Sequence, residues 1–183
     1  MKIRHKLLLI LVGAAVLTSL LIGLAASQLL RTAVRERSIH WLEAQTELLA
    51  EWVVHEVDPA RFQPFAKESG GHLGVRVTLI APDGAVVGDS AKSAGELALM
   101  DDHRTRPEVR SAEASGVGRS VRRSASVGVT YLYTARKIPG TGPVRYARIA
   151  LPFEEVQRVG ARYAIEGALS SLAALLLLTG IAY

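Results

Sequence analysis

The sequence contains no cysteine and none of the residue sets that usually mark an enzyme. With 183 residues and no cysteine, it excludes a disulfide framework, thiol catalysis and metal sites built from thiolates. It has no set of nucleophile, base and orienting residue, and no pair of carboxylates at a useful spacing. Gly116 and Gly118 lack the third glycine of a dinucleotide fingerprint and follow a predicted helix rather than a strand. We therefore predict no catalytic residue and no cofactor in this part of the protein.

Charge is absent from two long runs near the ends of the chain. No residue between positions 7 and 30 is charged, and none between positions 167 and 183. The middle, residues 31–162, carries 19 Lys/Arg against 16 Asp/Glu, which is ordinary for a globular domain. The formal net charge of +5 therefore does not indicate nucleic acid as a partner, and the apolar ends argue against a freely soluble enzyme.

The first apolar run is long enough to cross a membrane. Residues 7–26 would form about 30 Å of helix, the thickness of a bilayer's hydrocarbon core. Lys2, Arg4 and Lys6 precede the run, and such a cluster stays on the cytoplasmic side. We predict a cytoplasmic segment over 1–6 and a transmembrane helix over 7–28. The alternative is a signal peptide cleaved before Gln28, but the run exceeds the usual hydrophobic region of such peptides.

The second apolar run, residues 163–183, contains a single charge, Glu166. We expect a second transmembrane helix here, which would leave the middle of the chain outside the cytoplasm of a bacterial cell, in a multi-pass inner-membrane protein. A buried core helix of a soluble domain is the alternative. No Lys or Arg flanks the end of the run, as the positive-inside rule would require, and we therefore expect the sequence to be a fragment of a longer protein.

Helices are predicted for residues 29–69. From position 28 to 57 there is no proline or glycine, so the first span is expected to continue as one long helix, followed by a short helix that Gly70 and Gly71 end. The long helix carries a seven-residue repeat formed by Val34, Trp41, Leu48 and His55, with Ser38, Gln45 and Trp52 at intermediate steps. Two explanations stay open. Trp41, Leu48, Leu49, Trp52 and Val53 could cover the domain's own sheet, or the repeat could form a dimer seam.

Residues 70–155 are predicted to form five antiparallel strands. A hairpin is expected from residues 75–80 and 85–89, and three further strands from residues 118–126, 129–138 and 144–151. Helical turns are expected between the hairpin and the later strands, over residues 92–100 and from Pro107 to a stop at Gly116. Pro152 is predicted to begin an exit helix that continues through 156–162. The fold class is α+β, with one sheet face on the long helix and a pocket under the short helices and loops.

Several segments resemble a known family of sensors. Val77 to Gly84, Gly88 to Ser90, His103 with Arg106 to Val109, and the strand ending in Tyr131 to Tyr133 resemble the extracytoplasmic PAS-like domain, of the single Cache type, in bacterial membrane sensor histidine kinases. Within that family the sequence resembles the phosphate-regulon type of sensor kinase. The resemblance implies a homodimer in the membrane lipid, and a cytoplasmic kinase part that would bind ATP and Mg²⁺ and phosphorylate a response regulator.

The region between Arg104 and Arg148 is strongly basic. It holds ten Lys/Arg against Glu108 and Glu113, and guanidinium groups suit carboxylate or phosphate ligands. We therefore predict a small anionic ligand bound by some of a group of arginines, with a tyrosine hydroxyl nearby: Arg104, Arg122, Arg123, Tyr131 and Tyr133. Solvent-facing strands, ion pairs and contact with anionic lipid are the simpler roles for these arginines. His40, His55, His72 and His103 match no metal motif, and His103 is expected to hydrogen-bond within a loop.

The sequence thus predicts the sensing region of a two-component histidine kinase, which passes a stimulus through two membrane helices. The same input module could belong to a chemoreceptor or a cyclic-dinucleotide enzyme, or could serve as a membrane-anchored dimerisation module without a sensory role.

Overall fold

The computed structural model describes residues 3–55, 58–124, 128–154, 165–167, 169, 170 and 173. The chain divides into two compact units. One is Arg37–Glu155, and the other contains the N-terminal part of the chain up to Glu36. Helix α1, Ile3–His55, contributes to both. The long helix predicted from the lack of proline and glycine is confirmed.

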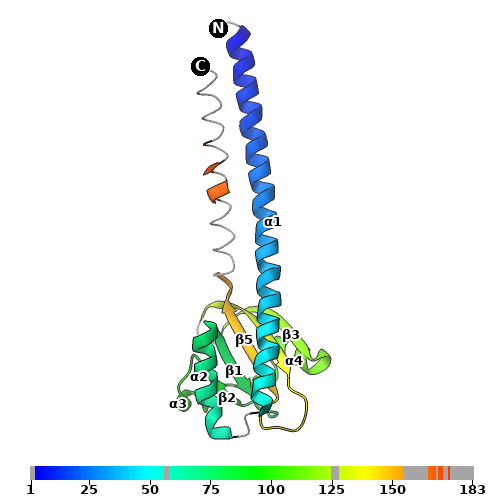
Figure 1. Cartoon of the computed structure of the whole chain (residues 1–183), viewed down its shortest axis with the longest axis vertical. Helices are drawn as coiled ribbons and strands as arrows, with labels where there is room; N and C mark the ends of the chain where they lie inside the picture. Colours follow the sequence, from blue (N-terminus) through cyan, green and yellow to red (C-terminus); the bar gives the residue numbers. More distant parts are fainter. Residues whose placement is uncertain are drawn as a thin grey trace. The chain divides into compact units, whose positions relative to one another are not determined.

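The unit Arg37–Glu155 is built on one antiparallel sheet of five strands (Figure 1). The strands are β1 (Arg76–Ile80), β2 (Val86–Asp89), β3 (Val117–Arg123), β4 (Thr130–Lys137) and β5 (Tyr146–Pro152), in the order β2-β1-β5-β4-β3. The predicted α+β class, hairpin and three later strands are confirmed, with strand ends shifted by up to three residues. The last strand in the chain, β5, lies at the centre of the sheet. Pro152 belongs to β5 and does not begin a helix; the helical residues that follow it begin at Phe153.

One face of the sheet packs on α1 and on α2 (Phe62–Leu73), which lie on the same side of it in Figure 1. Buried residues of α1 recur every three or four positions, which makes one helical stripe: Ile39, Leu42, Thr46, Leu49 and Val53. Alternate residues of two of the three inner strands meet this stripe: Val77 and Leu79 from β1, Ala147 and Ile149 from β5. The core therefore joins the C-terminal part of α1 to the middle of the sheet.

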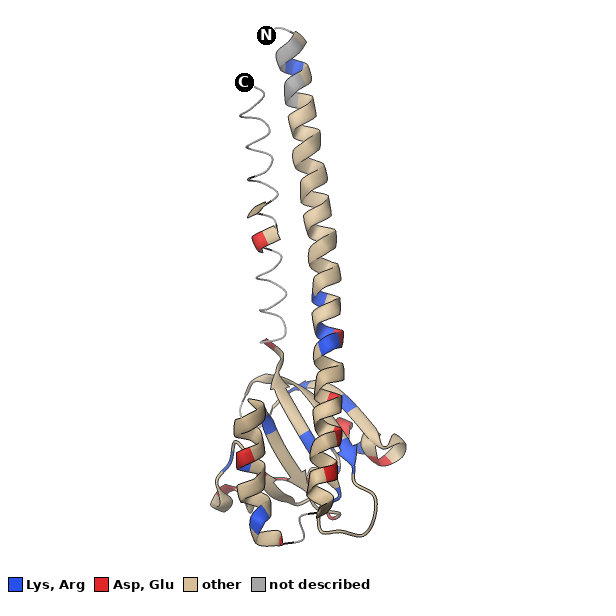
Figure 2. Cartoon of the chain, in the orientation of Figure 1, with Lys and Arg blue, Asp and Glu red and all other residues tan. Residues whose placement is uncertain are grey.

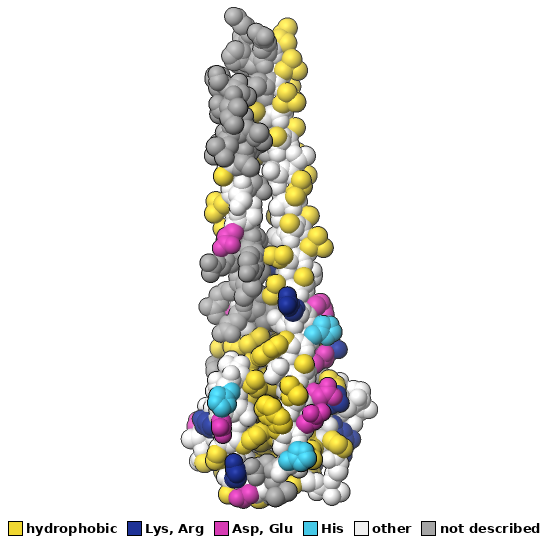
Figure 3. Space-filling view, in the orientation of Figure 1, with side chains coloured by type: hydrophobic (Ala, Val, Ile, Leu, Met, Phe, Trp, Pro, Cys, Tyr) yellow, Lys and Arg dark blue, Asp and Glu magenta, His cyan; other side chains and the backbone are white. Residues whose placement is uncertain are grey.

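A second stripe on α1 stays exposed. Leu49 and Val53 are buried against the sheet, as the first of the two explanations expected. In contrast, Trp41 and Trp52 are 41% and 53% exposed, and Leu48 is also exposed. The expectation that these three residues cover the sheet is wrong, because they lie outside the buried stripe of the helix. Figure 3 shows apolar side chains gathered over this part of the unit.

The prediction that the short helix ends at Gly70 and Gly71 is wrong. Helix α2 continues to Leu73 and is capped by Gly74 in the left-handed conformation, at φ 65°. A 3₁₀ turn over Pro59–Arg61 precedes the helix. Gly70 lies inside α2 for a packing reason, since a Cβ at this position would overlap the side chain of Ser90. Gly88 of β2 allows the same close approach to the backbone of Phe62. Glycine thus brings α2 against the edge of the sheet.

The opposite face of the sheet is covered by α3 (Ala94–Leu97) and α4 (Pro107–Ser115) with the loops that join them. As predicted, α4 begins with proline and ends at Gly116, which has φ 85°. Val109 and Ala112 of α4 form a small cluster with Ile80, Ala135 and Tyr146. Helix α4 also approaches β3 closely, since a Cβ at Gly118 would overlap the carbonyl group of Glu108.

Among the described residues, one helix is long and apolar enough to cross a membrane, and this is α1. Figure 2 shows the long uncharged stretch of this helix. The predicted exit helix over 156–162 lies outside the described residues, and the predicted second span over 163–183 lies almost entirely outside them.

A polar contact interrupts the apolar interface between α1 and the sheet. The hydroxyl oxygens of Thr46 in α1 and Thr134 in β4 are 2.6 Å apart, and both residues are buried. The Thr46 hydroxyl donates to the carbonyl oxygen of Leu42 at 2.6 Å, which leaves the Thr134 hydroxyl to donate to Thr46. Among the residues that the structure describes, the one other acceptor within reach of the Thr134 hydroxyl is the Leu42 carbonyl oxygen, at 3.4 Å.

This asymmetry predicts unequal effects of two similar substitutions. Thr46→Val should lower the free energy of unfolding by about 1–3 kcal/mol, because it leaves the buried hydroxyl of Thr134 without its hydrogen-bond acceptor. Thr134→Val should cost less, about 1 kcal/mol or below, because Thr46 keeps its bond to Leu42. Denaturant unfolding of the purified chain measures both, with Thr141→Val in an exposed loop as the control. Equal losses from the two variants would contradict the bonding pattern.

Candidate functional site

Strand alternation places a set of polar side chains on the face of the sheet that α1 does not cover. Arg76 and Thr78 on β1 are two residues apart, as are Ser120 and Arg122 on β3, so each pair lies on one face. In the sheet, Thr78 is directly opposite Arg148 of β5. Helix α4 adds Glu108 from its first turn. Three strands and a helix thus bring charged groups to one surface.

These groups form a continuous chain of hydrogen bonds. Glu108 accepts from Arg122 Nη2 at 2.8 Å, from Ser120 Oγ at 2.6 Å and from Arg148 Nη1 at 3.3 Å. Arg148 Nη2 donates to Thr78 Oγ1 at 3.0 Å, and Thr78 donates to Asp89 at 2.8 Å. Asp89 also accepts from Arg76 Nε at 3.0 Å. We call the residues that run across the sheet in this way the charge chain: Arg122, Glu108, Arg148, Thr78, Asp89 and Arg76.

Counted over the described residues, the charge chain carries one excess positive charge, and it is buried except for the half-buried Arg122. It holds three guanidinium groups and two carboxylates, and Asp89, Glu108 and Arg148 are at most 2% exposed. Arg148 has a further feature, since its Nε is buried without a hydrogen-bond partner in the described part of the chain. A buried donor without a partner is costly, as is a buried charge without a counter-ion. Both observations indicate that an acceptor with negative charge would stabilise this site.

The carboxylate of Glu108 is held in its ionised form. Burial alone would raise the pKa of Glu108, but hydrogen bonds from Arg122 and Ser120 and the charge of Arg148 outweigh it and lower the pKa to about 2. Burial lowers the pKa of the Arg148 guanidinium to about 10, while the charge of Glu108 opposes that shift. Both groups are therefore charged at neutral pH, and the excess positive charge is permanent there.

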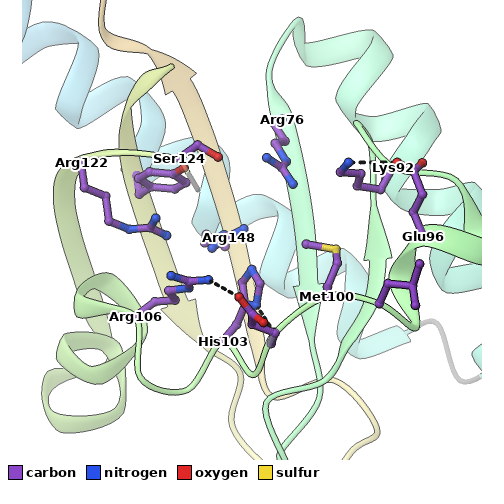
Figure 4. A pocket seen from close by; sticks show the side chains of 12 residues that line it. Arg76, Lys92, Glu96, Met100, His103, Arg106, Arg122, Ser124 and Arg148 are labelled. Carbon is purple, nitrogen blue, oxygen red and sulfur yellow. Dashed lines mark hydrogen bonds and ion pairs between the residues drawn. The ribbon is translucent and has the colours of Figure 1, made fainter. Parts of the chain in front are cut away.

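A cavity of about 290 Å³ opens on the charge chain. Figure 4 shows guanidinium groups turned toward it, with Met100 and His103 on the side of the loop that follows α3. Five cationic side chains line it: Arg76, Lys92, Arg106, Arg122 and Arg148. Lys92 pairs with Glu96 at 2.9 Å and Arg106 with Asp101 at 3.6 Å. Lys92 and Arg106, at the rim of the cavity, are thus each neutralised by a carboxylate. The charge chain, which forms its floor, keeps its excess positive charge.

The structure brings two of the predicted ligand residues to this cavity. Arg122 and Tyr133 both line it, and the Arg122 guanidinium lies 4.2 Å from the centre of the Tyr133 ring. Arg148 lies over the same ring at 5.1 Å. A cation over an aromatic face is attracted to it, so Tyr133 orients both guanidinium groups through its ring. The expected contact between a tyrosine hydroxyl and the ligand stays a prediction, and the ring face of Tyr133 has this orienting role beside it.

The other three predicted residues lie elsewhere. Arg104 is exposed and paired with Asp102 at 2.8 Å, and Arg123 donates to the carbonyl oxygen of Gly128 at 2.8 Å. Arg123 follows Arg122 on β3, so the two side chains lie on opposite faces. Tyr131 lines a separate, more open groove beside α2, with its ring 5.8 Å from that of Tyr133.

Residues beyond the predicted set complete the cavity. Arg76, Arg106 and Arg148 line it and were not singled out from the sequence, and His103 forms part of its wall. A signal for Arg148 is present in the sequence, since it is the one charged residue of residues 146–151. A cation in the middle of a central strand requires a buried partner. His103 hydrogen-bonds within its loop as expected, through Nδ1 and the Asp101 carbonyl at 2.6 Å.

Comparison with known proteins shows the fold. No protein-family model and no curated protein sequence matches the chain, but solved structures do. The ligand-binding domain of the Campylobacter jejuni chemoreceptor Tlp3, in complex with L-valine, matches with a TM-score of 0.62 and 14% identity, over 82% of this chain and 66% of that one. The sensor domain of the V. cholerae histidine kinase DctB matches with a TM-score of 0.58 and 10% identity, over 80% and 59%.

A third match is the ligand-binding domain of the Pseudomonas aeruginosa amino acid chemoreceptor PctC in complex with GABA, with a TM-score of 0.51 and 19% identity, over 74% of this chain and 62% of that one. The chain therefore spans about two thirds or less of the length of these domains. At such identities the likeness is one of fold. It confirms the PAS-like, Cache-like architecture with a five-stranded sheet and a long N-terminal helix, while the phosphate-regulon subtype stays a prediction.

The buried carboxylate provides a test of the charge chain. Glu108→Gln should lower the free energy of unfolding at neutral pH by about 3–5 kcal/mol, because it leaves two guanidinium groups without a counter-charge. The folded pKa of Glu108 lies below the unfolded value of 4.5, so its contribution is complete above pH 4.5 and declines as the pH falls toward 2. The difference between wild type and variant should therefore shrink over that interval.

Chemical denaturation at a series of pH values measures this difference. Glu47→Gln is the matched control, since Glu47 pairs with Arg136 at 2.8 Å on the exposed surface, and such a pair contributes about 0–1 kcal/mol. A Glu108→Gln variant as stable as the control at neutral pH would show that the charge chain does not depend on this carboxylate.

Proposed function

We propose that this chain is the signal-sensing region of a bacterial membrane receptor of the sensor histidine kinase type, and that the cavity on the charge chain binds a small anion. One observation carries the proposal, namely that the buried Nε of Arg148 has no hydrogen-bond partner in the described part of the chain, on a charge chain that holds more guanidinium groups than carboxylates. The fold supports a sensing role, because its structural neighbours include sensor and ligand-binding domains of receptors.

The ligand that suits the cavity differs from an amino acid. The matching chemoreceptor domains were solved with L-valine and with GABA bound, and both ligands carry an ammonium group. Here the two carboxylates that line the cavity, Glu96 and Asp101, already pair with Lys92 and Arg106. An ammonium group would have to break one of these pairs, whereas a carboxylate or phosphate oxygen could accept from the Nε of Arg148. We therefore favour an organic acid or phosphate without an ammonium group.

The sheet offers a path from the cavity to the helix that would enter the membrane. Tyr133 faces the cavity and the next residue, Thr134, contacts Thr46 of α1 on the opposite face of β4. A ligand that prefers one position of β4 would therefore also prefer one position of α1. It can shift the equilibrium between two arrangements only by its difference in affinity for them. In the receptor that we propose, this shift would reach a cytoplasmic kinase and its response regulator.

The exposed stripe of Trp41, Leu48 and Trp52 supports a homodimer as the working form. These residues lie at spacings of seven and four on α1 and are exposed in the single chain. Exposed apolar patches of this kind mark contact surfaces, and a seven-residue spacing suits a second parallel helix.

Anion binding is tested by ligand-induced thermal stabilisation of the purified chain with phosphate, sulfate and small dicarboxylates. We expect at least one of these anions to stabilise the wild type. Arg122→Met should weaken the affinity of the chain for that anion about tenfold or more, since the substitution removes a charged donor and the excess positive charge together. The variant should fold, because Glu108 and Arg148 remain as a neutral pair.

Arg123→Met is the matched control, since it removes the neighbouring guanidinium outside the cavity and should leave the affinity within about twofold. Stabilisation by none of the anions, or equal losses from the two variants, would contradict an anion site in this cavity.

The proposed topology has its own test. A reporter enzyme that is active only outside the cytoplasm, inserted after Thr141, should be active, and one that works only in the cytoplasm should be inactive. Thr141 is exposed in the loop between β4 and β5, so the insertion should leave the fold intact. The reverse pattern of activities would overturn the extracytoplasmic placement of the domain.

A further inference from the structure

His103 is a wall residue of the cavity whose hydrogen bond fixes its tautomer. It is 5% exposed, and its Nδ1 lies 2.6 Å from the carbonyl oxygen of Asp101. A carbonyl oxygen only accepts, so Nδ1 carries a proton. In the neutral ring Nε2 is then an acceptor, and no hydrogen bond joins Nε2 to any residue that the structure describes. The backbone N–H of His103 donates to Gly84 at 3.0 Å and holds the loop in place.

The charges that act on the ring are mainly positive. They come from β5, from the residue before α4 and from β3: Arg148, Arg106 and Arg122. The carboxylates on the surrounding elements are engaged elsewhere, Asp101 with Arg106, Asp102 with Arg104, Glu108 with Arg122 and Arg148, Asp89 with Arg76, and Glu96 with Lys92. Tyr133 on β4 lines the same cavity, and Tyr146 on β5 donates to Glu113.

These surroundings keep the imidazole of His103 unprotonated when no anion is bound. Burial, and after it the charge of Arg148, lowers the pKa of His103 to about 4. An unprotonated Nε2 has a lone pair directed away from Nδ1, and it repels the oxygen of an anion. A protonated Nε2 would donate to the same oxygen, and the anion would offset the three guanidinium charges that oppose protonation. Anion and proton therefore favour each other at this position.

We propose that His103 is an anion-binding residue that acts in its protonated form, so that the cavity takes up its anion together with one proton. The proposal rests on the proposed function, because both require an anion in this cavity. The direction of the pH dependence of anion affinity follows from linkage between proton and anion binding. Anion binding raises the pKa of His103, so affinity increases as the pH falls from the value in the complex toward that of the empty site. The increase is at most tenfold for each pH unit.

The experiment is isothermal titration of the full chain in nonionic micelles with sulfate and with methanesulfonate, at about pH 5 and about pH 7.5. Both probes keep a constant charge over this range, so only the protein titrates. We expect the wild type to bind at least one of them about fivefold or more tightly at the lower pH. His103→Asn keeps a donor for the Asp101 carbonyl but cannot gain a charge, and its affinity should change less than about twofold. His72→Asn, at an exposed position of α2, should behave as the wild type.

A measurement on the wild type alone covers the case in which His103→Asn does not fold. The ¹H–¹⁵N spectrum of histidine-labelled chain at about pH 6 should show Nε2 of His103 unprotonated without the anion and protonated with it. Binding that is independent of pH, or an Nε2 that stays unprotonated in the complex, would overturn the role of His103 and leave the anion site standing. Binding of neither probe at either pH would overturn the role of His103, and it would overturn the anion site as well if phosphate and the dicarboxylates also fail to stabilise the chain.

Discussion

The carboxylate of Glu108, held between two guanidinium groups away from water, is the interaction on which this domain is organised. Removing an ion from water is costly, and only close hydrogen bonds from oppositely charged partners offset that cost. Glu108 reaches Arg122 on β3 and Arg148 on β5, so the contact fixes α4 relative to two strands that are not neighbours in the sheet. The positions of α4, β3 and β5 therefore depend on the same few atoms.

The sheet separates two environments that the chain needs for different purposes. Its face toward α1 is apolar and accounts for most of the core, while the other face holds the charge chain and the cavity. Because strand residues alternate between faces, the neighbours Tyr133 and Thr134 contact different environments: Tyr133 lines the cavity and Thr134 contacts α1. A signal from the cavity thus has a short route through one strand, and it does not have to travel around the edge of the sheet.

The order and type of the elements could be predicted from the sequence, because local signals set them. Pro107 and Gly116 mark the ends of α4, and β-branched runs mark the strands. Gly70 misled the prediction of α2, because the residue serves a close contact with Ser90 rather than a helix end. A local rule cannot distinguish these two uses of glycine, since the second depends on an element twenty residues away.

The candidate site was less accessible to sequence reasoning. The basic composition of residues 104–148 indicated an anion, but it did not separate Arg122 from Arg123, whose side chains lie on opposite faces of β3. Arg76 lies outside that basic region, and register alone brings it to the same face as Arg148. Long-range pairing of strands, rather than local charge, decides which arginines meet.

The close approach of α4 to β3 at Gly118 has a consequence for how relatives of this protein can be recognised. Any larger residue there would push away the turn that presents Glu108, so the backbone distance and the carboxylate have to be inherited together. The arrangement ties a Pro-Glu pair at a helix start to a Gly-x-Ser-x-Arg strand whose glycine comes ten residues after the glutamate. At identities as low as those of its structural neighbours, this spacing would distinguish chains that share the charged surface from chains that share only the architecture.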